Sequence, residues 1–393
     1  MSHPSVSIQF RRGLVIVVFL GVLLIVSVLP VAARSRQQTK ASGGEPIPEH
    51  AIQGILAAFD KYEVVAMPEA HGQKDLDDFI LSLIRTPAFA DKVNDIEVEC
   101  GNSLYQPILD RYIAGDDVSF REAQKVWRNT TQPMCGMSGF FEQFFPLVRA
   151  INQKLPPAHR LRVLAGDPPI DWQQVKSAAD VRKFGSRSST ITSVMEKEVL
   201  AKHRKALMLF GTFHLFHTSP GSAVAAYEKD YPNLTFVISD LDTFDMELPA
   251  SWPIPSLVPA KGTWMGGLDL GHFYPAPISM DSECRVRNEF SKDLQKPMAE
   301  LVDAFLYLHP ERLALKEQIP ADIVLDSKYW TELKRRETLQ GLPGTSAQQI
   351  VSDAESPLDY FPTAEETKAL MQGPLVQQDV QECLAKKGKG ERH

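Results

Sequence analysis

The sequence has no excess of basic residues. Its 393 residues include 42 Lys and Arg against 49 Asp and Glu, which gives a formal net charge of −7. No stripe of Lys and Arg interleaved with aromatic residues occurs. Binding to a phosphate backbone depends on such a positive surface. We therefore expect no nucleic-acid partner.

Several short functional motifs are also absent. There is no Gly-x-x-x-x-Gly-Lys and no Gly-x-Gly-x-x-Gly, so no nucleotide site is indicated. The absence of Gly-x-Ser-x-Gly argues against a serine hydrolase of the α/β type. The chain also lacks His-Glu-x-x-His and Cys-x-x-Cys, which argues against a compact zinc motif or a thioredoxin site. Any active site must be assembled from residues far apart in the chain.

A long apolar run lies near the amino terminus, from Gly13 to Leu29. The small residues of Pro30-Val-Ala-Ala33 that follow it suit cleavage by a signal peptidase. The run is longer than a usual signal core and only just long enough to cross a bilayer. Two interpretations stay open, a cleaved signal peptide over residues 1–33 or a membrane anchor over residues 13–33. Either one predicts export to the periplasmic or extracytoplasmic side, secreted or held by a single membrane pass.

The periodicity of apolar residues predicts one domain. A polar linker over residues 34–48 leads into alternating strands and helices over residues 49–330. Aromatic clusters in residues 116–158 indicate a helical insertion, either a lid or a packed subdomain. Residues 331–393 are polar and predicted to form a peripheral tail.

The chain has four cysteines, and export would allow them to form two disulfides. Three pairings are possible, and the sequence does not rank them. Cys100 follows an acidic motif and could be a nucleophile, but a structural or buried thiol is the favoured interpretation. The four are Cys100, Cys135, Cys284 and Cys383.

Six apolar runs of the predicted domain end in ionisable residues. In a parallel sheet the carboxyl ends of all strands lie along one edge, so these side chains can meet in one crevice. The pattern predicts an α/β fold with a mostly parallel sheet flanked by helices. Ile323-Val-Leu is a possible seventh strand. The residues at the ends of the six runs are Glu69 and His71, Glu99, Asp167, His214, Asp240, and His309.

A histidine held by a carboxylate can act as a general base, because the acid fixes its tautomer and stabilises the imidazolium. We therefore predict that His71 is the general base, that Glu69 and Glu99 orient it or the water, and that His214 and Asp167 bind the transition state or a metal. With Asp167 the same set could instead hold a divalent metal that activates water. Further residues are predicted to face the substrate: Glu97, Arg111, Asp240, and His272 and Tyr274 on a Pro- and Gly-rich loop over 249–287.

The order of several short motifs resembles a known superfamily. The motifs are Glu69-Ala-His-Gly, Glu97-Val-Glu-Cys-Gly-Asn, Leu109-Asp-Arg-Tyr-Ile-Ala-Gly, Gly166-Asp and Gly211-Thr-Phe-His. They resemble the superfamily of erythromycin esterase-like proteins and ChaN-type haem-binding lipoproteins, and the last is also similar to the Gly-x-x-His motif of the TraB/Tiki group. The resemblance covers residues 50–330.

The resemblance implies two alternative functions. An esterase-like protein would use Glu69, His71, Glu99 and His214 to activate water against an ester, lactone or amide of a small-molecule substrate. A ChaN-like protein would bind haem in the cell envelope without turnover, and an exposed His or Tyr such as His272 or Tyr274 would supply the iron ligand. The chain departs from the esterase pattern at Pro68, where a glycine is common, and by the single residue between Glu69 and His71.

Overall fold

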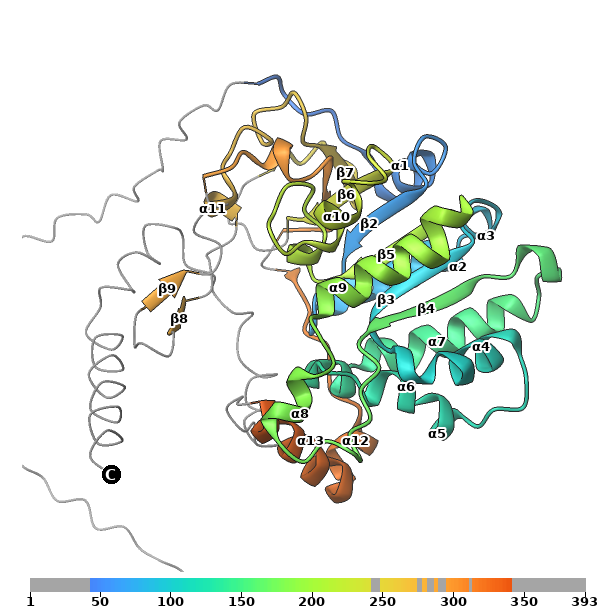
Figure 1. The fold of residues 1–393 in the computed structure, drawn as a ribbon. Coiled ribbons are helices and arrows are strands. Elements are labelled where there is room, and N and C mark those ends of the chain that lie inside the picture. Colours follow the sequence, from blue (N-terminus) through green and yellow to red (C-terminus); the bar gives the residue numbers. More distant parts are fainter. Residues whose placement is uncertain are drawn as a thin grey trace, which may run out of the picture. The chain divides into compact units, whose positions relative to one another are not determined.

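Alternating apolar residues form the strands of an eight-stranded sheet, whose order is β1-β7-β10-β6-β2-β5-β3-β4 (Figure 1). The six strands from β10 to β4 run parallel to one another. β7 pairs antiparallel with β10, and β1 antiparallel with β7. The predicted α/β fold with a mostly parallel sheet is thus confirmed. The strands are β1 (Glu49–His50), β2 (Val64–Pro68), β3 (Asp95–Asn102), β4 (Arg162–Asp167), β5 (Ala206–Phe210), β6 (Thr235–Asp240), β7 (Ser256–Pro259) and β10 (Ala304–Tyr307).

This computed structural model describes residues 43–241, 248–273, 278–280, 286–288, 295–310 and 313–340. A separate pair of short strands, β8 (Ile278–Met280) and β9 (Val286–Asn288), is antiparallel. The predicted signal or anchor segment lies outside the described residues, as do Cys284 and Cys383. Among the described helices, none has the length and apolar character needed to cross a membrane.

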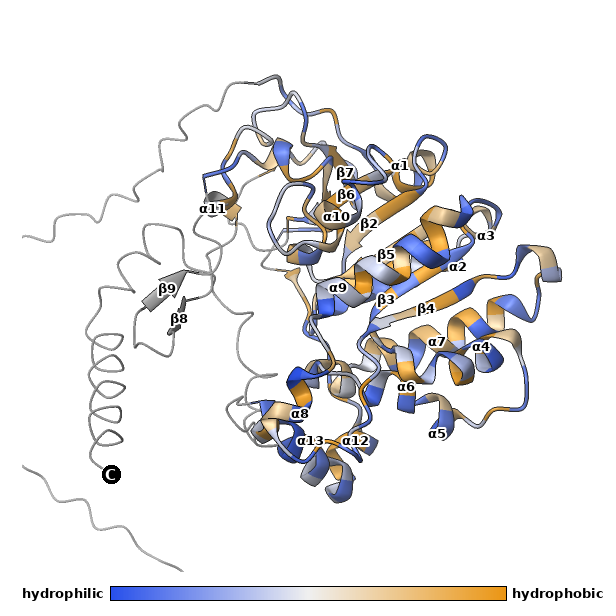
Figure 2. Cartoon of the chain, viewed as in Figure 1, coloured by the Kyte–Doolittle hydropathy of each residue, from blue (hydrophilic) through white to orange (hydrophobic). Residues whose placement is uncertain are grey.

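Two apolar cores cover the two faces of the sheet, because successive strand residues point to opposite sides. In β2, Val65 and Met67 join one core, whereas Val64 and Ala66 join the other. The strands are correspondingly coloured as apolar in Figure 2. The helices that contribute to the first core are α1 (Ala51–Ala58), α2 (Lys74–Arg85), α3 (Pro87–Lys92), α4 (Gln106–Ala114), α5 (Phe120–Ala123), α6 (Lys125–Arg128) and α7 (Gly139–Asn152).

The second core packs under α9 (Arg187–Val194), which Figure 1 shows lying over the sheet. A π-helical turn, Met195–Val199, continues α9 and buries Met195 and Val199 against the strands. Two further helices, α10 (Ala223–Tyr227) and α11 (Leu270–Phe273), contribute to the same core. Each face of the sheet is therefore closed, and only its edges and strand ends remain for a site.

The predicted helical insertion packs into the first core. It contains α5, α6, a 3-10 helix over Pro133–Met137 and all of α7. Its aromatic side chains, including Trp127 and the phenylalanines of α7, are buried. A disulfide joins Cys135 of the 3-10 helix to Cys100 in β3. Cys100 is therefore a buried, oxidised residue and no free nucleophile in this structure, and the insertion is fastened to the strand that carries Glu99.

Three predicted elements differ from the structure. Ile323-Val-Leu belongs to a short helix, α12 (Ala321–Leu325), which starts directly after Pro320. The predicted loop over 249–287 contains strand β7, whose apolar run of Leu257 and Val258 is too short to stand out in the sequence. A longer helix, α13 (Ser327–Gln340), crosses the predicted start of the tail at residue 331. A remaining short helix is α8 (Ala178–Arg182).

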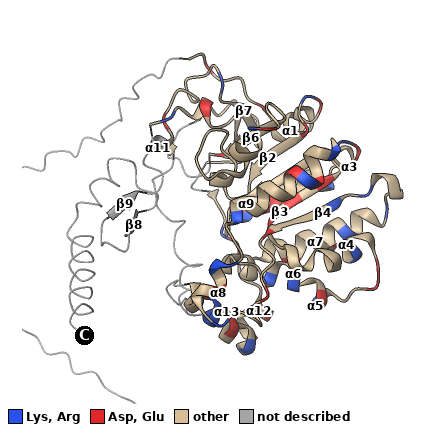
Figure 3. Ribbon diagram, viewed as in Figure 1, with Lys and Arg blue, Asp and Glu red and all other residues tan. Residues whose placement is uncertain are grey.

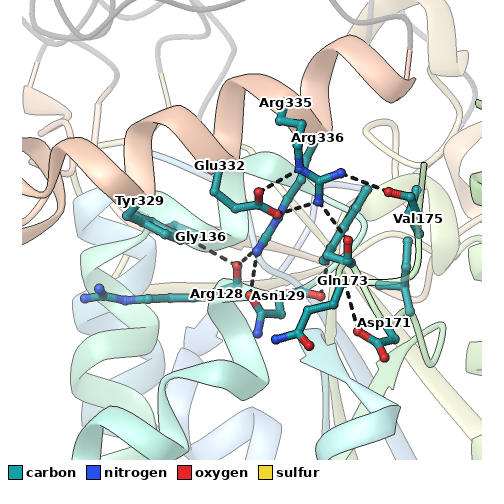
Figure 4. Close-up of polar contacts among 12 residues, drawn as sticks. Arg128, Asn129, Gly136, Asp171, Gln173, Val175, Tyr329, Glu332, Arg335 and Arg336 are labelled. Carbon is teal, nitrogen blue, oxygen red and sulfur yellow. Dashed lines mark hydrogen bonds and ion pairs between the residues drawn. The ribbon is translucent and has the colours of Figure 1, made fainter. Parts of the chain in front are cut away.

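Polar side chains attach α13 to the insertion and to the segment after β4 (Figure 4). The buried Arg336 donates to the backbone carbonyl of Arg128 at 2.7 Å and to Asn129 Oδ1 at 2.8 Å. Arg335 donates to the carbonyl of Val175 at 2.9 Å. Tyr329 Oη donates to the carbonyl of Gly136 at 3.0 Å. These bonds satisfy carbonyl groups that lie in no strand or long helix.

Replacement of Arg336 by Ala should lower the free energy of unfolding by about 1–3 kcal/mol, because it leaves buried carbonyl and amide groups without donors. Urea denaturation followed by circular dichroism measures this change. Lys334→Ala, on the exposed side of the same helix, is the matched control and should change stability little. Equal stability of the two variants would contradict a structural role for the Arg336 contacts.

Candidate active site

Glu99 is the centre of a group of charged residues at the carboxyl end of the parallel strands. It lies in β3, which Figure 3 shows partly in the colour of acidic residues, and it is 3% exposed. Its Oε1 forms an ion pair with Arg187, and its Oε2 accepts a hydrogen bond from the backbone N–H of Gly211 at 2.6 Å. Burial opposes ionisation, but the hydrogen bond from His71 and the charge of Arg187 outweigh it and hold the pKa of Glu99 well below its usual range.

His71 lies between two carboxylates in the turn after β2. Its Nδ1 is 3.2 Å from Glu69 Oε1, and its Nε2 is 3.8 Å from Glu99 Oε1. Gly72 makes the turn possible because its φ of +89° is unfavourable for a residue with a side chain. Burial would lower the pKa of His71, but Glu69 and Glu99 together raise it well above the ordinary value. The two carboxylates therefore favour the protonated imidazole.

Arg187 connects Glu99 to Asp167, the residue at the end of β4. It is the first residue of α9, whose amino terminus Ser186 caps by accepting from the N–H of Ser189. Arg187 Nε lies 3.3 Å from Asp167 Oδ1, and Thr131 donates to Asp167 through its N–H at 2.6 Å. Burial raises the pKa of Asp167 to about 6, although Arg187 and Thr131 oppose the shift. Arg187 thus compensates two buried carboxyl groups at once.

His214 lies at the end of β5, in a 3-10 helix over Thr212–His214. Its Nδ1 is 3.2 Å from Ser188 Oγ of α9. Burial lowers the pKa of His214, and the charge of Arg187 lowers it further, although Glu99 acts in the opposite direction. Its surroundings therefore favour the neutral imidazole. The pKa values of the two histidines of the site are shifted in opposite directions.

The structure brings together Glu69, His71, Glu99, Asp167 and His214, the five residues predicted for catalysis or metal binding. Their strands are parallel, so the carboxyl ends share one edge, as the sequence predicts. Asp240 lies beside this group, because its Oδ1 accepts from Thr212 Oγ1 at 3.2 Å.

Two of the residues predicted to face the substrate lie apart from this group, one buried and one on the surface. Glu97 shares a face of β3 with Glu99 but is 0% exposed, because its strand neighbours Leu164 and Met208 belong to the second core. Burial raises the pKa of Glu97 well above its ordinary value, so the side chain is uncharged. Arg111 is 61% exposed and lies 3.6 Å from Asp116 on the surface.

Other predicted residues lie outside the group or outside the described part of the chain. His309 pairs with Asp75 of α2, 3.1 Å from its Oδ2. Tyr274 lies outside the described residues, and of His272 only the backbone is described, within α11. The haem alternative depends on these last two side chains.

Arg187, Thr131 and Ser188 are site residues that the sequence did not single out. None of them directly follows an apolar run that predicts a strand, whereas the predicted site residues do. The run Ser186-Arg-Ser-Ser189 at the start of an amphipathic segment is the only available indication. A capped helix start that points back to the carboxyl edge of a sheet is a usual place for a substrate-binding or charge-compensating residue.

The predicted metal ligands at the strand ends, Glu69, His71, Glu99 and Asp167, do not suit a divalent metal. Ligand atoms of Glu69, His71 and Glu99 lie within 4.8 Å of one another. However, both oxygens of Glu99 already accept from Arg187 and from the Gly211 N–H, and those of Asp167 accept from Thr131. A cation bound there would have to displace the guanidinium of Arg187 or lie beside it. We therefore assign the charge compensation of this site to Arg187.

A cavity of about 310 Å³ extends from Arg187 and Thr131. Its walls are mainly apolar or small side chains, and Gln132 and Gln340 add amide groups. The remaining lining residues are Pro133, Pro168, Val181, Phe184 and Gly185. A small molecule could bind there with one polar group against Arg187.

A second histidine cluster lies at the opposite edge of the sheet, near the amino ends of β6 and β10. His217 Nε2 is 2.9 Å from Asp303 Oδ2, and its Nδ1 is 2.8 Å from Glu228 Oε2. Lys261 also pairs with Asp303. Burial opposes the charge of His217, but Asp303 and Glu228 outweigh it and raise its pKa to about 9. This cluster fastens α10 to the sheet and has no contact with Glu99.

Stability should fall as pH rises from about 6.5 to about 9, because the folded state must keep a proton on His217 that the unfolded chain has already lost. An imidazole whose pKa is raised by folding contributes its full stabilisation of the folded state at pH values below its unfolded pKa, about 6.5. This contribution is lost as the pH rises to the folded pKa. Thermal unfolding between pH 6 and pH 10 measures the effect. His217→Gln should flatten this slope, and an unchanged slope in that variant would assign the effect to other groups.

Arg187→Met should destabilise the protein by about 3–5 kcal/mol at pH 7.5, since it leaves Glu99 and Asp167 buried without their cation. The loss should be smaller at pH 5, where protonation can relieve the buried charge. Urea denaturation at both pH values tests this. Arg111→Met, which removes an exposed arginine, is the control. A loss for Arg187→Met that does not depend on pH would contradict the electrostatic explanation.

No family profile matches this chain, and no curated protein matches it either. Solved structures show distant likenesses. A Bacillus cereus protein has 10% identity over 72% of this chain and 97% of its own, with a TM-score of 0.42. A succinoglycan biosynthesis protein has 9% identity over 72% and 97%, with a TM-score of 0.42.

ChaN of Campylobacter jejuni, which binds haem cofacially, has 11% identity over 50% of this chain and 87% of its own, with a TM-score of 0.32. ChaN-type proteins are also part of the sequence resemblance. Scores this low assign neither hydrolysis nor haem binding to the chain, so a function has to be argued from the site itself.

Proposed function

We propose that the protein is a hydrolase that activates water against the carbonyl group of a small ester, lactone or amide. The observation that carries this proposal is the placement of two histidines near Glu99, with His71 between two carboxylates and His214 against the hydroxyl of Ser188. A neutral imidazole can take a proton from water, and an imidazolium can donate one, so together they provide both halves of general acid–base catalysis.

In the proposed reaction, neutral His214 accepts a proton from water while the water oxygen bonds to the carbonyl carbon. The imidazolium of His71 and the guanidinium of Arg187 stabilise the negative charge that develops on the carbonyl oxygen. When the intermediate breaks down, the bond to the leaving group is broken and His71 supplies the proton that this group needs. His214 then returns its proton through solvent, and His71 regains one.

This assignment exchanges the roles predicted from the sequence, where His71 is the base. A histidine between two buried carboxylates binds its proton too strongly to take another at neutral pH. His214 has an arginine nearby and only a hydroxyl, that of Ser188, on its Nδ1. Glu69 and Glu99 serve to hold His71 protonated and in place.

The cavity beside Arg187 supports a small substrate with an apolar part. Pro133, Pro168 and Phe184 provide apolar walls, and Arg187 is the charged residue among its lining side chains. Pockets of about this size commonly bind small organic molecules whose orientation is fixed by a few polar groups.

The rate of ester hydrolysis should be highest near neutral pH. It should fall at acidic pH, below the ordinary imidazole range, where His214 becomes protonated, and fall again at alkaline pH, where His71 loses its proton. Measurement of kcat/KM for p-nitrophenyl esters of increasing acyl length, from pH 5 to pH 10, tests this. A rate that keeps rising at alkaline pH would instead support His71 as the base.

Two variants separate the roles of the histidines. His214→Asn should lower kcat by about 10²–10⁴-fold, the usual contribution of a general base. His71→Gln should remove the alkaline limb of the profile as well as lowering the rate. His159→Gln, in a half-exposed histidine next to Asp91, is the control and should leave turnover unchanged. Full activity in His214→Asn would contradict the mechanism.

The proposal places the protein outside the cytoplasm, because the apolar run at residues 13–29 resembles a signal or anchor and Cys100 is disulfide-bonded to Cys135. Mass spectrometry of the protein purified from cells distinguishes the two interpretations. A mature chain that begins at Arg34 would indicate cleavage. An intact amino terminus in the membrane fraction would indicate an anchor, and an intact chain in the cytosol would contradict export.

A further inference from the structure

The disulfide lies directly beside His71. The sulfur atoms of Cys100 and Cys135 and a ring nitrogen of His71 all lie within 4.8 Å of one another. Both cysteines are 0% exposed. The three residues come from three segments, the turn after β2, strand β3 and the insertion, so their proximity is a product of the tertiary fold.

A buried oxygen next to His71 has no donor. Oε2 of Glu69 is without a hydrogen-bond partner among the described residues, although Oε1 of the same side chain pairs with His71. Glu69 is only 2% exposed. Unpaired carboxylate oxygens are costly in the protein interior. A bound cation would supply the missing partner.

Two cysteines and one histidine that lie together are ligands typical of zinc. Thiolates and imidazole are preferred by Zn²⁺, which is usually bound by four protein ligands in structural sites. The group of Glu69, His71 and Glu99 does not suit a metal, because Arg187 already neutralises the charge of Glu99. The sulfur atoms, by contrast, are bonded only to each other.

We propose that the dithiol form of this protein binds one Zn²⁺ through Cys100, Cys135 and His71. A dithiol reductant transfers two electrons and two protons to the disulfide, which breaks the sulfur–sulfur bond and gives two thiols, while the reductant becomes a disulfide. Zinc binding then releases both thiol protons and the proton on the coordinating nitrogen of His71. The metal and the catalytic imidazolium are therefore mutually exclusive uses of the same side chain.

Cobalt is the probe for this site, because thiolate-bound Co²⁺ has an intense charge-transfer absorption that oxygen and nitrogen ligands do not give. The full-length protein is reduced with dithiothreitol, freed of it without oxygen, and titrated with Co²⁺ alongside the oxidised protein. The reduced protein should take up one equivalent with the thiolate band, and Zn²⁺ should remove the band by displacement. The oxidised protein should show no such band.

Variants identify the ligands. Cys135→Ser and His71→Gln should each weaken cobalt binding by at least about 10–100-fold, since even the loss of an outer-shell partner has an effect of this size. Cys284→Ser is the control and should keep the band. Loss of the band in Cys284→Ser, or its persistence at full affinity in Cys135→Ser or His71→Gln, would overturn the assignment.

Thermal unfolding tests the zinc site even if reduction alone unfolds the chain. Added Zn²⁺ should raise the melting temperature of the reduced protein and leave that of the oxidised protein unchanged. A reduced chain that stays unfolded with equimolar Zn²⁺ would overturn the proposal. None of these readouts depends on catalysis, so failure here leaves the proposed hydrolase unaffected, and failure to hydrolyse esters leaves the zinc site unaffected.

Discussion

The ionised carboxylate of Glu99, buried at the end of β3, is the constraint on which the rest of the site depends. Removing a carboxylate from water costs several kcal/mol even after the protein relaxes. The fold offsets this cost with three partners from different segments: Arg187 of α9, the N–H of Gly211 after β5, and His71 after β2. A Cβ at position 211 would lie 3.3 Å from Glu99 Oε2, so a larger residue there would crowd this close approach. One charge thereby fixes the relative positions of four segments.

The same arrangement separates the protonation states of the two histidines. His71 has carboxylates near both ring nitrogens, whereas His214 has a hydroxyl on Nδ1, and burial together with Arg187 outweighs the opposing charge of Glu99. Because one imidazole is stabilised in its charged form and the other in its neutral form, the site can accept and donate protons at the same pH. The disulfide next to His71 adds a covalent link between the insertion and β3.

Much of the fold and half of the site follow from the sequence by one rule. Apolar runs that end in Glu, Asp or His predict strands with reactive residues at a common edge, and β2, β3, β4, β5, β6 and β10 are all parallel. The rule fails where the signal is not periodic. Arg187 starts a helix of weak amphipathic character, and nothing in its neighbours predicts that it will reach two strand ends.

The alternation of apolar and acidic residues along β3 does not distinguish Glu97 from Glu99. Glu97 and Glu99 share a face of β3, and the pattern does not show how far the second core extends along that face. Glu99 lies beyond its edge and is charged, but Glu97 lies within it and is neutral. How far the second core covers this face of β3 is set by α9 and the π-helical turn after it. The position of these two elements depends on tertiary packing. Strand β7 was missed for a related reason, since its two buried apolar residues are too few to show a period.

The account rests on the opposite protonation of His71 and His214. Titration of the imidazole carbons and nitrogens by NMR, in protein labelled at histidine and assigned with His71→Gln and His214→Asn, measures both pKa values directly. The account predicts that His71 is still protonated above pH 7, in the range where His214 is already neutral, with the pKa of His214 below about 6.5. Two histidines that titrate together near the ordinary value, or a lower pKa for His71 than for His214, would contradict it.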